Sequence, residues 1–170
     1  LYRMAEMMEG KRTEFVDVLK TTMGYTAAAG DKAVDSAIDA LVYFSGFADK
    51  YQQLMGSVNP VSGPHHNFTS TEPVGVVGLH FDKKFDLGDL VAQIAAIICS
   101  GNTVVALLPI EGGATLAPLA EVFATSDLPK GVVNLLTGYS DELYKHLGSH
   151  MEINSISYQG NNVKTLAELK

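Results

Sequence analysis

Few side chains in this sequence have the chemistry of a catalyst, and Cys99 comes first because it is the single thiol. It ends the apolar run Ala95-Ala96-Ile97-Ile98. Apolar burial raises a thiol's pKa and keeps it protonated, so Cys99 is predicted to be structural rather than nucleophilic. A lone cysteine excludes an internal disulfide and suits a reducing compartment, from which we expect a cytoplasmic location.

The adjacent His65 and His66 are the candidate metal ligands. Neighbouring side chains in an extended segment point to opposite faces, and the sequence brings no further ligands to either one. We therefore predict no metal site, and no residue is predicted to be catalytic.

A phosphate-binding turn is the third possible chemistry. Gly112-Gly113 opens a predicted helix, where free backbone N–H groups can bind an anion, and Lys83 and Lys84 would add positive charge. The sequence lacks the spacing G-x-G-x-x-G, and paired glycines are common in ordinary loops. A nucleotide-binding turn and a plain loop both stay open.

Composition limits the partners. The chain has 170 residues, 46% hydrophobic and 18% charged, with a net charge of -7, which fits one globular domain. Arg3 and Arg12 are the only arginines and no basic stripe is present, so nucleic acid is not an expected partner. The apolar stretch Leu90–Ile110 is interrupted by Ser100-Gly101-Asn102, too early for a membrane span, so a membrane is not expected either.

The elements that must position any site fall into three parts of one compact unit. These are a helical lead-in over 1–56, a polar hairpin arm over 57–71 and an α/β domain over 72–170. The lead-in is predicted to contain two helices, over 2–20 and Asp31–Leu54, the second capped by Asp31. Turn residues such as Ser62-Gly63-Pro64 and the polar character of the segment predict the arm.

From Pro73 onward, β-branched runs alternate with helical patterns. The predicted strands are Val74–Leu79, Thr103–Leu108, Val132–Leu136 and Ile153–Tyr158. The predicted helices are Leu87–Cys99, Ala114–Thr125, Asp141–Leu147 and one that starts near Asn162. This alternation indicates a doubly wound, Rossmann-like parallel sheet of about four strands, with any ligand beyond the carboxyl ends of the strands.

Three blocks at consistent spacing carry a resemblance. They are Glu72–Gly78, Ser100–Val105, and Leu128–Asn134 with Thr137-Gly138. In this order they resemble the coenzyme-binding half of the aldehyde dehydrogenase superfamily, and Ile156–Gly160 looks like its fourth-strand block. The resemblance implies NAD(P) as cofactor, with Phe81, Gly138, Gly160 and Asn161 as coenzyme-binding residues. It also implies that the arm contributes to oligomer contacts.

The sequence departs from the family where the ligand would bind. Lys84 stands where the family has an Asn that stabilises the substrate oxyanion, and Leu107 and Ile110 stand where it has a ribose-binding Lys and Glu. Further departures are Ser140 for a second glycine, Asn161 for a Ser, Lys164 for an apolar adenine contact and Thr165 for a closing glycine. These changes predict that no dinucleotide is bound tightly, and the likeness is greatest to the degenerate second domain of two-domain members.

Three hypotheses follow. The first is a non-catalytic aldehyde dehydrogenase-like domain with a structural or assembly role, acting as a homodimer or docking to another aldehyde dehydrogenase domain. The second is a fragment of an active NAD(P)-dependent aldehyde dehydrogenase, consistent with a chain that begins at Leu1. The third is a residual nucleotide-binding regulatory module.

Overall fold

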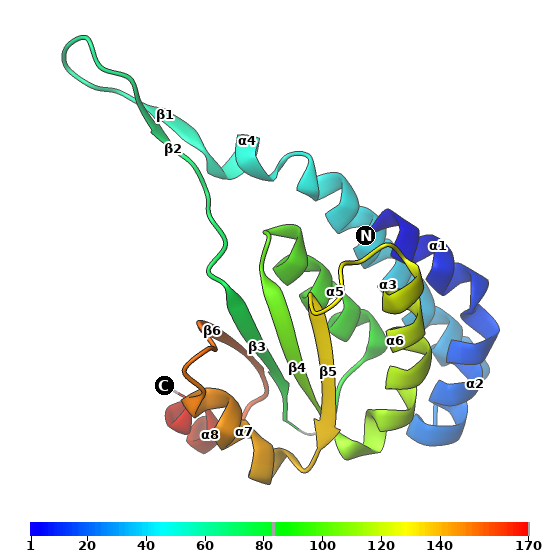
Figure 1. The fold of residues 1–170 in the computed structure, drawn as a ribbon. Coiled ribbons are helices and arrows are strands. Elements are labelled where there is room, and N and C mark those ends of the chain that lie inside the picture. The colour runs from blue at the N-terminus through cyan, green and yellow to red at the C-terminus, as the bar shows by residue number, and fades with distance from the viewer. Residues whose placement is uncertain (83, 170) are drawn as a thin grey trace.

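A parallel sheet with helices on both faces follows a helical lead-in and a projecting hairpin (Figure 1). The computed structural model describes residues 1–82 and 84–169. The lead-in comprises α1 (Tyr2–Gly10), α2 (Arg12–Met23), α3 (Ala27–Ala48) and α4 (Tyr51–Met55), and the hairpin comprises β1 (Ser57–Asn59) and β2 (Asn67–Thr69). The α/β part comprises β3 (Val76–Phe81), α5 (Leu87–Cys99), β4 (Thr103–Pro109), the 3-10 helix η1 (Ile110–Thr115), α6 (Leu116–Thr125), β5 (Val133–Gly138), α7 (Ser140–Ser149), β6 (Ser155–Gln159) and α8 (Val163–Glu168).

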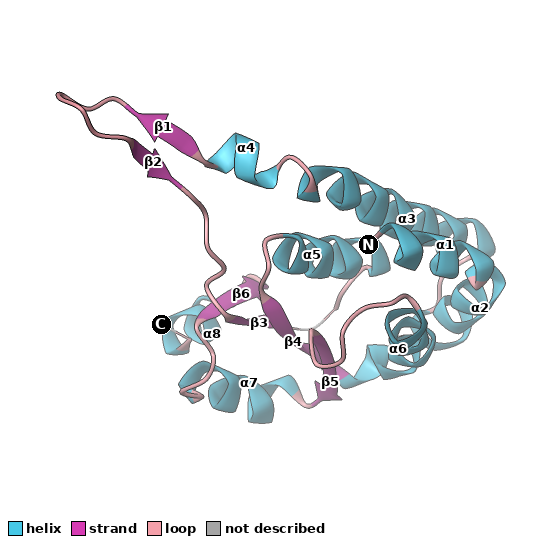
Figure 2. Ribbon diagram, turned by 45° about the horizontal axis from the view of Figure 1, so that its top comes forward, coloured by secondary structure: helices cyan, strands magenta, loops and turns pink. Residues whose placement is uncertain are grey.

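The four strands of the sheet run in the order β5-β4-β3-β6, and every pairing is parallel. Helices α3, α5 and α6 lie over one face and α7 and α8 lie over the other (Figure 2). The doubly wound fold predicted from the sequence is therefore confirmed. Each strand ends one or two residues later than predicted, at Phe81, Pro109, Gly138 and Gln159.

The lead-in has more helices than predicted. The helix expected over 2–20 is divided at Lys11, which leaves helical geometry just after Gly10, a residue with low helix propensity. The helix expected over Asp31–Leu54 is also divided, because α3 ends at Ala48 and the short α4 follows. The prediction of two lead-in helices was wrong.

The start of α3 corrects a second prediction. Thr26, not Asp31, is the N-cap: its backbone is extended and its hydroxyl accepts a hydrogen bond of 3.2 Å from the Ala29 amide. Three alanines follow Thr26 and extend the helix by a full turn before Asp31. Asp31 instead faces Arg12, which has its Nη1 3.9 Å from an Asp31 oxygen.

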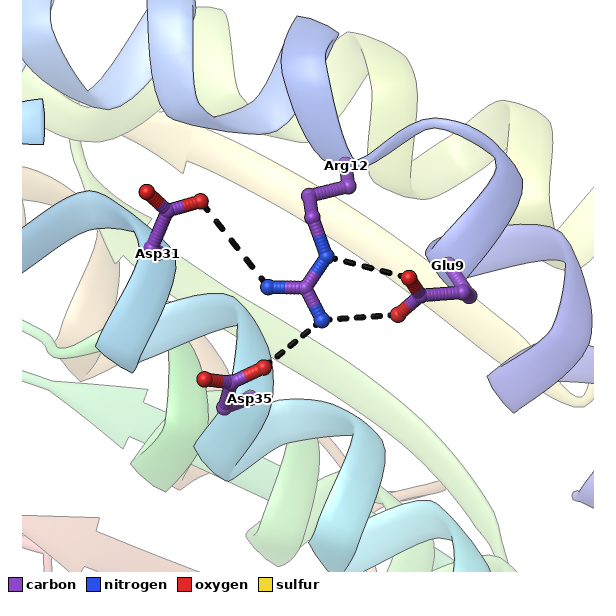
Figure 3. Close-up of polar contacts among 4 residues, drawn as sticks. All are labelled: Glu9, Arg12, Asp31 and Asp35. Atoms are coloured by element: carbon purple, nitrogen blue, oxygen red, sulfur yellow. Dashed lines mark hydrogen bonds and ion pairs between the residues drawn. The ribbon is translucent and has the colours of Figure 1, made fainter. Parts of the chain in front are cut away.

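Arg12 joins the first three helices (Figure 3). Its guanidinium binds both carboxylate oxygens of Glu9 on α1, at 3.1 and 2.7 Å, and an oxygen of Asp35 on α3 at 2.6 Å. These partners hold the pKa of Arg12 above its usual value, through the Glu9 hydrogen bond first and the Asp35 hydrogen bond second. A planar guanidinium suits this geometry because its donors form a rigid fork.

Two glycine segments also differ from their predicted places. Gly112-Gly113 lies inside η1 rather than at the start of α6. Gly75 precedes β3 with φ of 126°, a conformation that favours glycine, so the predicted strand begins two residues too early. The space beside the Cα of Gly75 is occupied by Asn154, whose Oδ1 accepts a 2.8 Å hydrogen bond from the Val76 amide.

The interior contains one large and one small apolar cluster. The large cluster lies between the sheet and the lead-in helices, α5 and α6, and includes Phe15, Leu41, Leu79, Leu90 and Leu119, all 0 or 1% exposed. The small cluster lies under α7 and consists of Leu107, Tyr144 and Leu147 with partly buried neighbours. Side-chain alternation along β4 divides its residues, so that Leu108 packs into the large cluster and Leu107 into the small one.

The hairpin arm extends away from the rest of the chain (Figure 1). Val58 pairs with Phe68 in the antiparallel register, and both side chains are exposed, at 75% and 66%. Asn59 binds the side chains of Asn67 and Thr69, at 3.1 and 2.9 Å. Because side chains alternate between the faces of a strand, the arm has one apolar pair opposite a polar ladder.

No described helix is both long enough and apolar enough to cross a membrane.

Candidate functional site

The candidate site lies where the four parallel strands end, which is the usual ligand edge of such a sheet. Three neighbouring cavities open there, with volumes of about 610, 340 and 480 Å³. The first is lined by Thr22, Met23, Tyr25, Lys84, Phe85, Asp86, Pro109, Glu111 and Gly112. The second is lined by Asp82, Pro109, Ile110, Glu111, Gly138, Tyr139, Ser140 and Asp141, and the third by Asp82, Lys84, Gln159, Gly160, Asn161 and Asn162.

Three of the four predicted coenzyme-binding residues line these cavities. Gly138 contributes to the second cavity, and Gly160 and Asn161 contribute to the third. Phe81 does not reach them: its side chain is 4% exposed and packs edge-on against Phe85, with ring centroids 6.0 Å apart. Asp82 borders both cavities, so Gly138, Gly160 and Asn161 lie at the same edge of the sheet.

Side chains of the protein itself fill the space beside the site glycines. A Cβ at Gly160 would meet the Tyr158 hydroxyl, and Tyr158 Cζ at 2.5 Å. That hydroxyl donates to Asp82 Oδ2 at 3.3 Å and accepts from the Asn162 amide at 3.1 Å, so Tyr158 is held over Gly160. A Cβ at Gly138 would lie 2.5 Å from Leu143 Cδ1.

Gly112 shows the same arrangement. A Cβ there would meet the Phe85 ring, with Cζ at 2.5 Å. Gly112 is itself buried and the place of its Cβ faces an aromatic ring, so of the two alternatives left open for Gly112-Gly113 the structure favours a plain connection over a phosphate-binding turn.

The charge of this edge is mainly negative. Asp82, Glu111 and Asp141 line the second cavity. Of the described cations, Lys84 lines the first and third cavities, while Lys83 lies outside the described residues. Three carboxylates around one small cavity repel an anionic ligand.

Three residues stand at positions where the family has residues that contact the ligand, and they occupy different environments. Leu107 is 2% exposed in the small apolar cluster and borders the apolar groove under α7, so its side chain does not reach the three cavities at the ligand edge. Ile110 is exposed and lines the second cavity beside Glu111. Lys164 is on the surface of α8, with its Nζ 4.0 Å from a Glu168 oxygen.

His80 is the central residue that the sequence analysis missed. It is 0% exposed, and its ring is stacked with those of Tyr144 and Tyr158 at centroid distances of 6.0 and 5.5 Å. Its Nε2 lies 3.2 Å from Ser140 Oγ, at the first residue of α7. Side-chain alternation along β3 could have indicated its position, because His80 shares a strand face with Gly78, which packs against Leu147 of α7.

Burial lowers the pKa of His80 from its usual value, although the charge of Asp82 and a contact with the Leu107 backbone oppose this shift. The imidazole is therefore neutral at pH 7. The flanking Tyr144 hydroxyl donates to Glu168 on α8, and this bond is the main reason that the pKa of Tyr144 rises to about 12.

Cys99 lies away from this edge. It ends α5, which precedes the amino end of β4, and its thiol donates to the Phe44 carbonyl at 3.5 Å. The side chain is partly buried, less than the apolar surroundings in the sequence suggested. Its pKa is raised by desolvation, as predicted.

His65 and His66 lie on the exposed arm. Across residues 1–82 and 84–169, no group of three or more His, Cys, Asp or Glu side chains is arranged to hold a metal ion.

Comparison with known proteins explains the arrangement of elements. The model of the aldehyde dehydrogenase family matches residues 1–165. The chain belongs to this family. Among curated aldehyde dehydrogenase relatives, it is 30% identical over 161 residues to "Aldehyde dehydrogenase, cytosolic 1" of Elephantulus edwardii, covering 94% of this chain and 32% of the relative. It is also 33% identical over 166 residues to "Cytosolic 10-formyltetrahydrofolate dehydrogenase" of Homo sapiens, covering 94% of this chain and 18% of the relative.

Solved aldehyde dehydrogenase structures have the same fold. The NAD+ complex of the Bacillus cereus aldehyde dehydrogenase superposes with a TM-score of 0.90 at 25% identity, covering 98% of this chain and 34% of that one. A structure described as a putative aldehyde dehydrogenase from Burkholderia cenocepacia gives a TM-score of 0.91 at 25% identity, with 98% and 34% coverage. The chain thus spans about a third or less of the length of these relatives.

Proposed function

We propose that this aldehyde dehydrogenase-like domain has an assembly role and binds NAD(P) weakly or not at all. The observation that carries the proposal is the ligand edge of the sheet, where the protein's own side chains occupy the space that the site glycines leave. Tyr158 covers Gly160 and Leu143 covers Gly138. A dinucleotide placed against the Cβ side of either glycine would meet these side chains.

Electrostatics support the same proposal. The diphosphate of a dinucleotide would approach Asp82, Glu111 and Asp141 around the second cavity. Desolvating an anion beside carboxylates is unfavourable, and the fixed donors of this edge would have to offset that cost. The described residues therefore do not fit a tightly held NAD(P).

The arm supports the assembly role. Val58 and Phe68 expose an apolar pair far from the body of the domain, and exposed apolar groups of this kind are typical of interaction sites. We infer a symmetric homodimer, or docking to another aldehyde dehydrogenase domain, through this arm. The relatives named cytosolic support a cytoplasmic location for this assembly.

Two measurements test the proposal. Titration calorimetry with NAD+ and NADP+ is expected to give a dissociation constant in the millimolar range or weaker, about -4 kcal/mol or less favourable. A micromolar constant would overturn the weak-binding part, because it would show that Tyr158 and Leu143 move aside.

Light scattering tests the assembly part. The double variant Val58→Ser, Phe68→Ser is expected to dissociate the oligomer, whereas His65→Ala, also on the arm but outside the Val58–Phe68 pair, is expected to leave it intact. A wild-type mass equal to one chain that does not change on dilution would exclude self-association.

A second candidate function has one specific observation in its favour. The fold superposes on an NAD+ complex of an aldehyde dehydrogenase, and Gly138, Gly160 and Asn161 line cavities at the same edge of the sheet. This observation favours a coenzyme-binding part of an NAD(P)-dependent aldehyde dehydrogenase. Tight binding in the calorimetric titration would favour it over the assembly role.

A further inference from the structure

In the part of the chain that the structure describes, β5 is an edge strand that pairs with β4 on one side only (Figure 1). The Val104 amide donates to the Val132 carbonyl at 2.8 Å, so the backbone groups of Val132 face β4. Backbone groups alternate in direction from one residue to the next along a strand. The N–H and C=O groups that point away from β4 are therefore those of Val133, Leu135 and Thr137.

This edge is not protected in the ways that natural sheets usually protect an exposed strand. Such strands commonly contain a proline or a charged side chain, or are covered by another segment. The strand Val133–Gly138 contains neither proline nor a charged residue. Helix α7 packs mainly on β3 and β4, which leaves Leu136 of β5 49% exposed. The edge of β5 is therefore open to pairing with a further strand.

An apolar groove borders the strand on each face of the sheet. The groove under α7, of about 350 Å³, includes Leu136 together with Val105 and Leu143. The groove on the α6 side, of about 370 Å³, includes Val133 and Leu135. Because side chains alternate between the two faces of a strand, a strand laid against β5 would direct its side chains over both grooves in turn.

We propose that this further strand is β5 of a second copy of the chain, and that the two strands pair antiparallel across a two-fold axis at Leu135. About this axis Leu135 lies opposite its own copy, and Val133 lies opposite Thr137 of the second copy. Each outward N–H then meets an outward C=O, because the three outward residues are symmetric about Leu135. The two parallel sheets join into one continuous sheet.

Charges at the two ends of β5 favour a second copy over an unrelated peptide. Lys130 precedes the strand and Asp141 follows it, and both are exposed. Within one chain the strand keeps them roughly 20 Å or more apart, at about 3.3 Å per residue. Antiparallel pairing about Leu135 brings Lys130 of each copy beside Asp141 of the other. These opposite charges offset part of the repulsion between two chains of net charge -7, which salt also screens.

The pairing is independent of the proposed arm contact, because no residue of the arm takes part. The first test therefore uses the arm variant Val58→Ser, Phe68→Ser, in which the β5 contact remains. Sedimentation at rising protein concentration is expected to show the mass of two chains. The same variant separates the two proposals, since loss of the arm contact leaves this mass unchanged.

A proline substitution tests the outward hydrogen bonds. Thr137→Pro, added to the arm variant, removes an N–H that β4 does not use, so the fold is expected to persist by circular dichroism. Two hydrogen bonds are lost per pair of chains, which is expected to raise the dissociation constant about tenfold or more. The matched control Thr137→Val keeps the N–H and is expected to leave the constant nearly unchanged.

A charge exchange tests the antiparallel direction. Lys130→Glu is expected to weaken the association, because the new carboxylate lies beside Asp141 of the other copy. The double variant Lys130→Glu, Asp141→Lys is expected to restore it. Restoration would report a contact between copies, because the two residues lie at opposite ends of the strand in one chain.

Disulfide formation tests the register. Asn134 and Leu136 of opposite copies form a non-hydrogen-bonded pair, in which Cα atoms lie about 4.5 Å apart and a disulfide can form. In a Cys99→Ser background, a mixture of Asn134→Cys and Leu136→Cys chains is expected to cross-link. The control mixture of Asn134→Cys with Lys145→Cys, on α7, is expected not to do so.

Three results would overturn the proposal. One is a one-chain mass of the arm variant at every concentration, and another is equal cross-linking in both cysteine mixtures. The third is a one-chain mass with saturable binding of the synthetic peptide Thr-Val-Thr-Val-Thr-Val, which would assign the edge to an extended segment of another protein.

Discussion

The two faces of the sheet are built in different ways. On the face covered by the lead-in helices, α5 and α6, the large apolar cluster contains many side chains with no exposed surface, such as Phe15 and Leu90. On the face covered by α7 and α8, three buried residues form the small cluster, and Leu136 of β5 is 49% exposed. The second face is connected largely by polar and aromatic contacts around His80.

The difference indicates a division of roles between the faces. The first face supplies most of the apolar burial, and with it most of the folding free energy. The second face contains the groups that differ most from an apolar core, namely a buried imidazole, two tyrosines and a partly exposed serine. A substitution of the same type should therefore have unequal effects on the two faces.

A pair of leucine substitutions tests this comparison most strongly. Leu90→Ala, on the first face, is expected to lower the free energy of unfolding by about 3–5 kcal/mol, because close-packed neighbours cannot fill the cavity. Leu147→Ala, on the second face, is expected to cost about 2 kcal/mol, since an open apolar groove lies beside it. Urea denaturation measures both, and equal losses would contradict the proposed division.

A pair of glycine substitutions tests the comparison by adding a methyl group rather than removing side-chain atoms. Gly112→Ala is expected to destabilise by about 1–3 kcal/mol, because the new methyl group meets the buried Phe85 ring. In Gly148→Ala, within α7, the methyl group meets Leu169 Cδ2, the end of a flexible side chain, at 2.9 Å. The gain in helix propensity, up to about 1 kcal/mol, should make that variant neutral or more stable in thermal melts.

The pH dependence of stability tests the second face, because protonation of the buried His80 puts a positive charge there. Burial lowers the pKa of His80 in the folded state, so the unfolded chain binds more protons between the two pKa values. The contribution of neutral His80 is complete above the unfolded value near 6.5 and is lost as pH falls toward the lower folded value. Nearby Asp82 and a contact with the Leu107 backbone reduce this loss.

The wild-type free energy of unfolding is therefore expected to decrease between pH 7.5 and 5.5. His80→Leu is expected to flatten this part of the profile. The pKa of Glu168 is lowered from 4.5, mainly by Tyr144, so its own contribution is lost at lower pH. An unchanged slope in His80→Leu would show that another group controls the acid response.

The smallest expected effect concerns Arg12. Arg12→Lys keeps the positive charge but cannot bind both oxygens of Glu9 and reach Asp35 together. Because the site is partly exposed, the expected loss is below about 1 kcal/mol, measured by denaturation at low and high salt. A loss that persists at 1 M salt would indicate that geometry rather than charge is responsible.

Much of the fold was predictable because β3 and β4 are almost continuous apolar runs that alternate with helical patterns. The short, β-branched run Thr103–Leu108 favoured a strand, and α5 was predicted with its observed bounds, Leu87–Cys99. In the structure Asp86 caps this helix and Ser100-Gly101 follows it. The break at Lys11 was not predictable from periodicity, because α1 and α2 both bury apolar stripes. The cap at Thr26 was missed because Asp31 offered an equally acceptable capping residue.

The site was predictable in outline only. The family blocks placed Gly138, Gly160 and Asn161 at one edge, and the structure brings them there. Sequence order could not show that Tyr158 would cover Gly160, because both the ring direction and the Asp82 contact depend on the pairing of β3 with β6. The Ser140–His80 contact likewise joins residues 60 positions apart.

The sheet order also has a consequence for folding kinetics. Strand β3 pairs on one side with β4, the next strand along the chain, and on the other side with β6, which follows only after β4 and β5. Pairings between distant segments form slowly, because a long loop must close first. The edge of β3 that pairs with β6 is therefore expected to stay unpaired while the large cluster is already forming. His80 lies on this strand. An early folding intermediate should contain β3, β4 and β5 with an open β3 edge, and that edge is where a nascent chain would be most prone to aggregate.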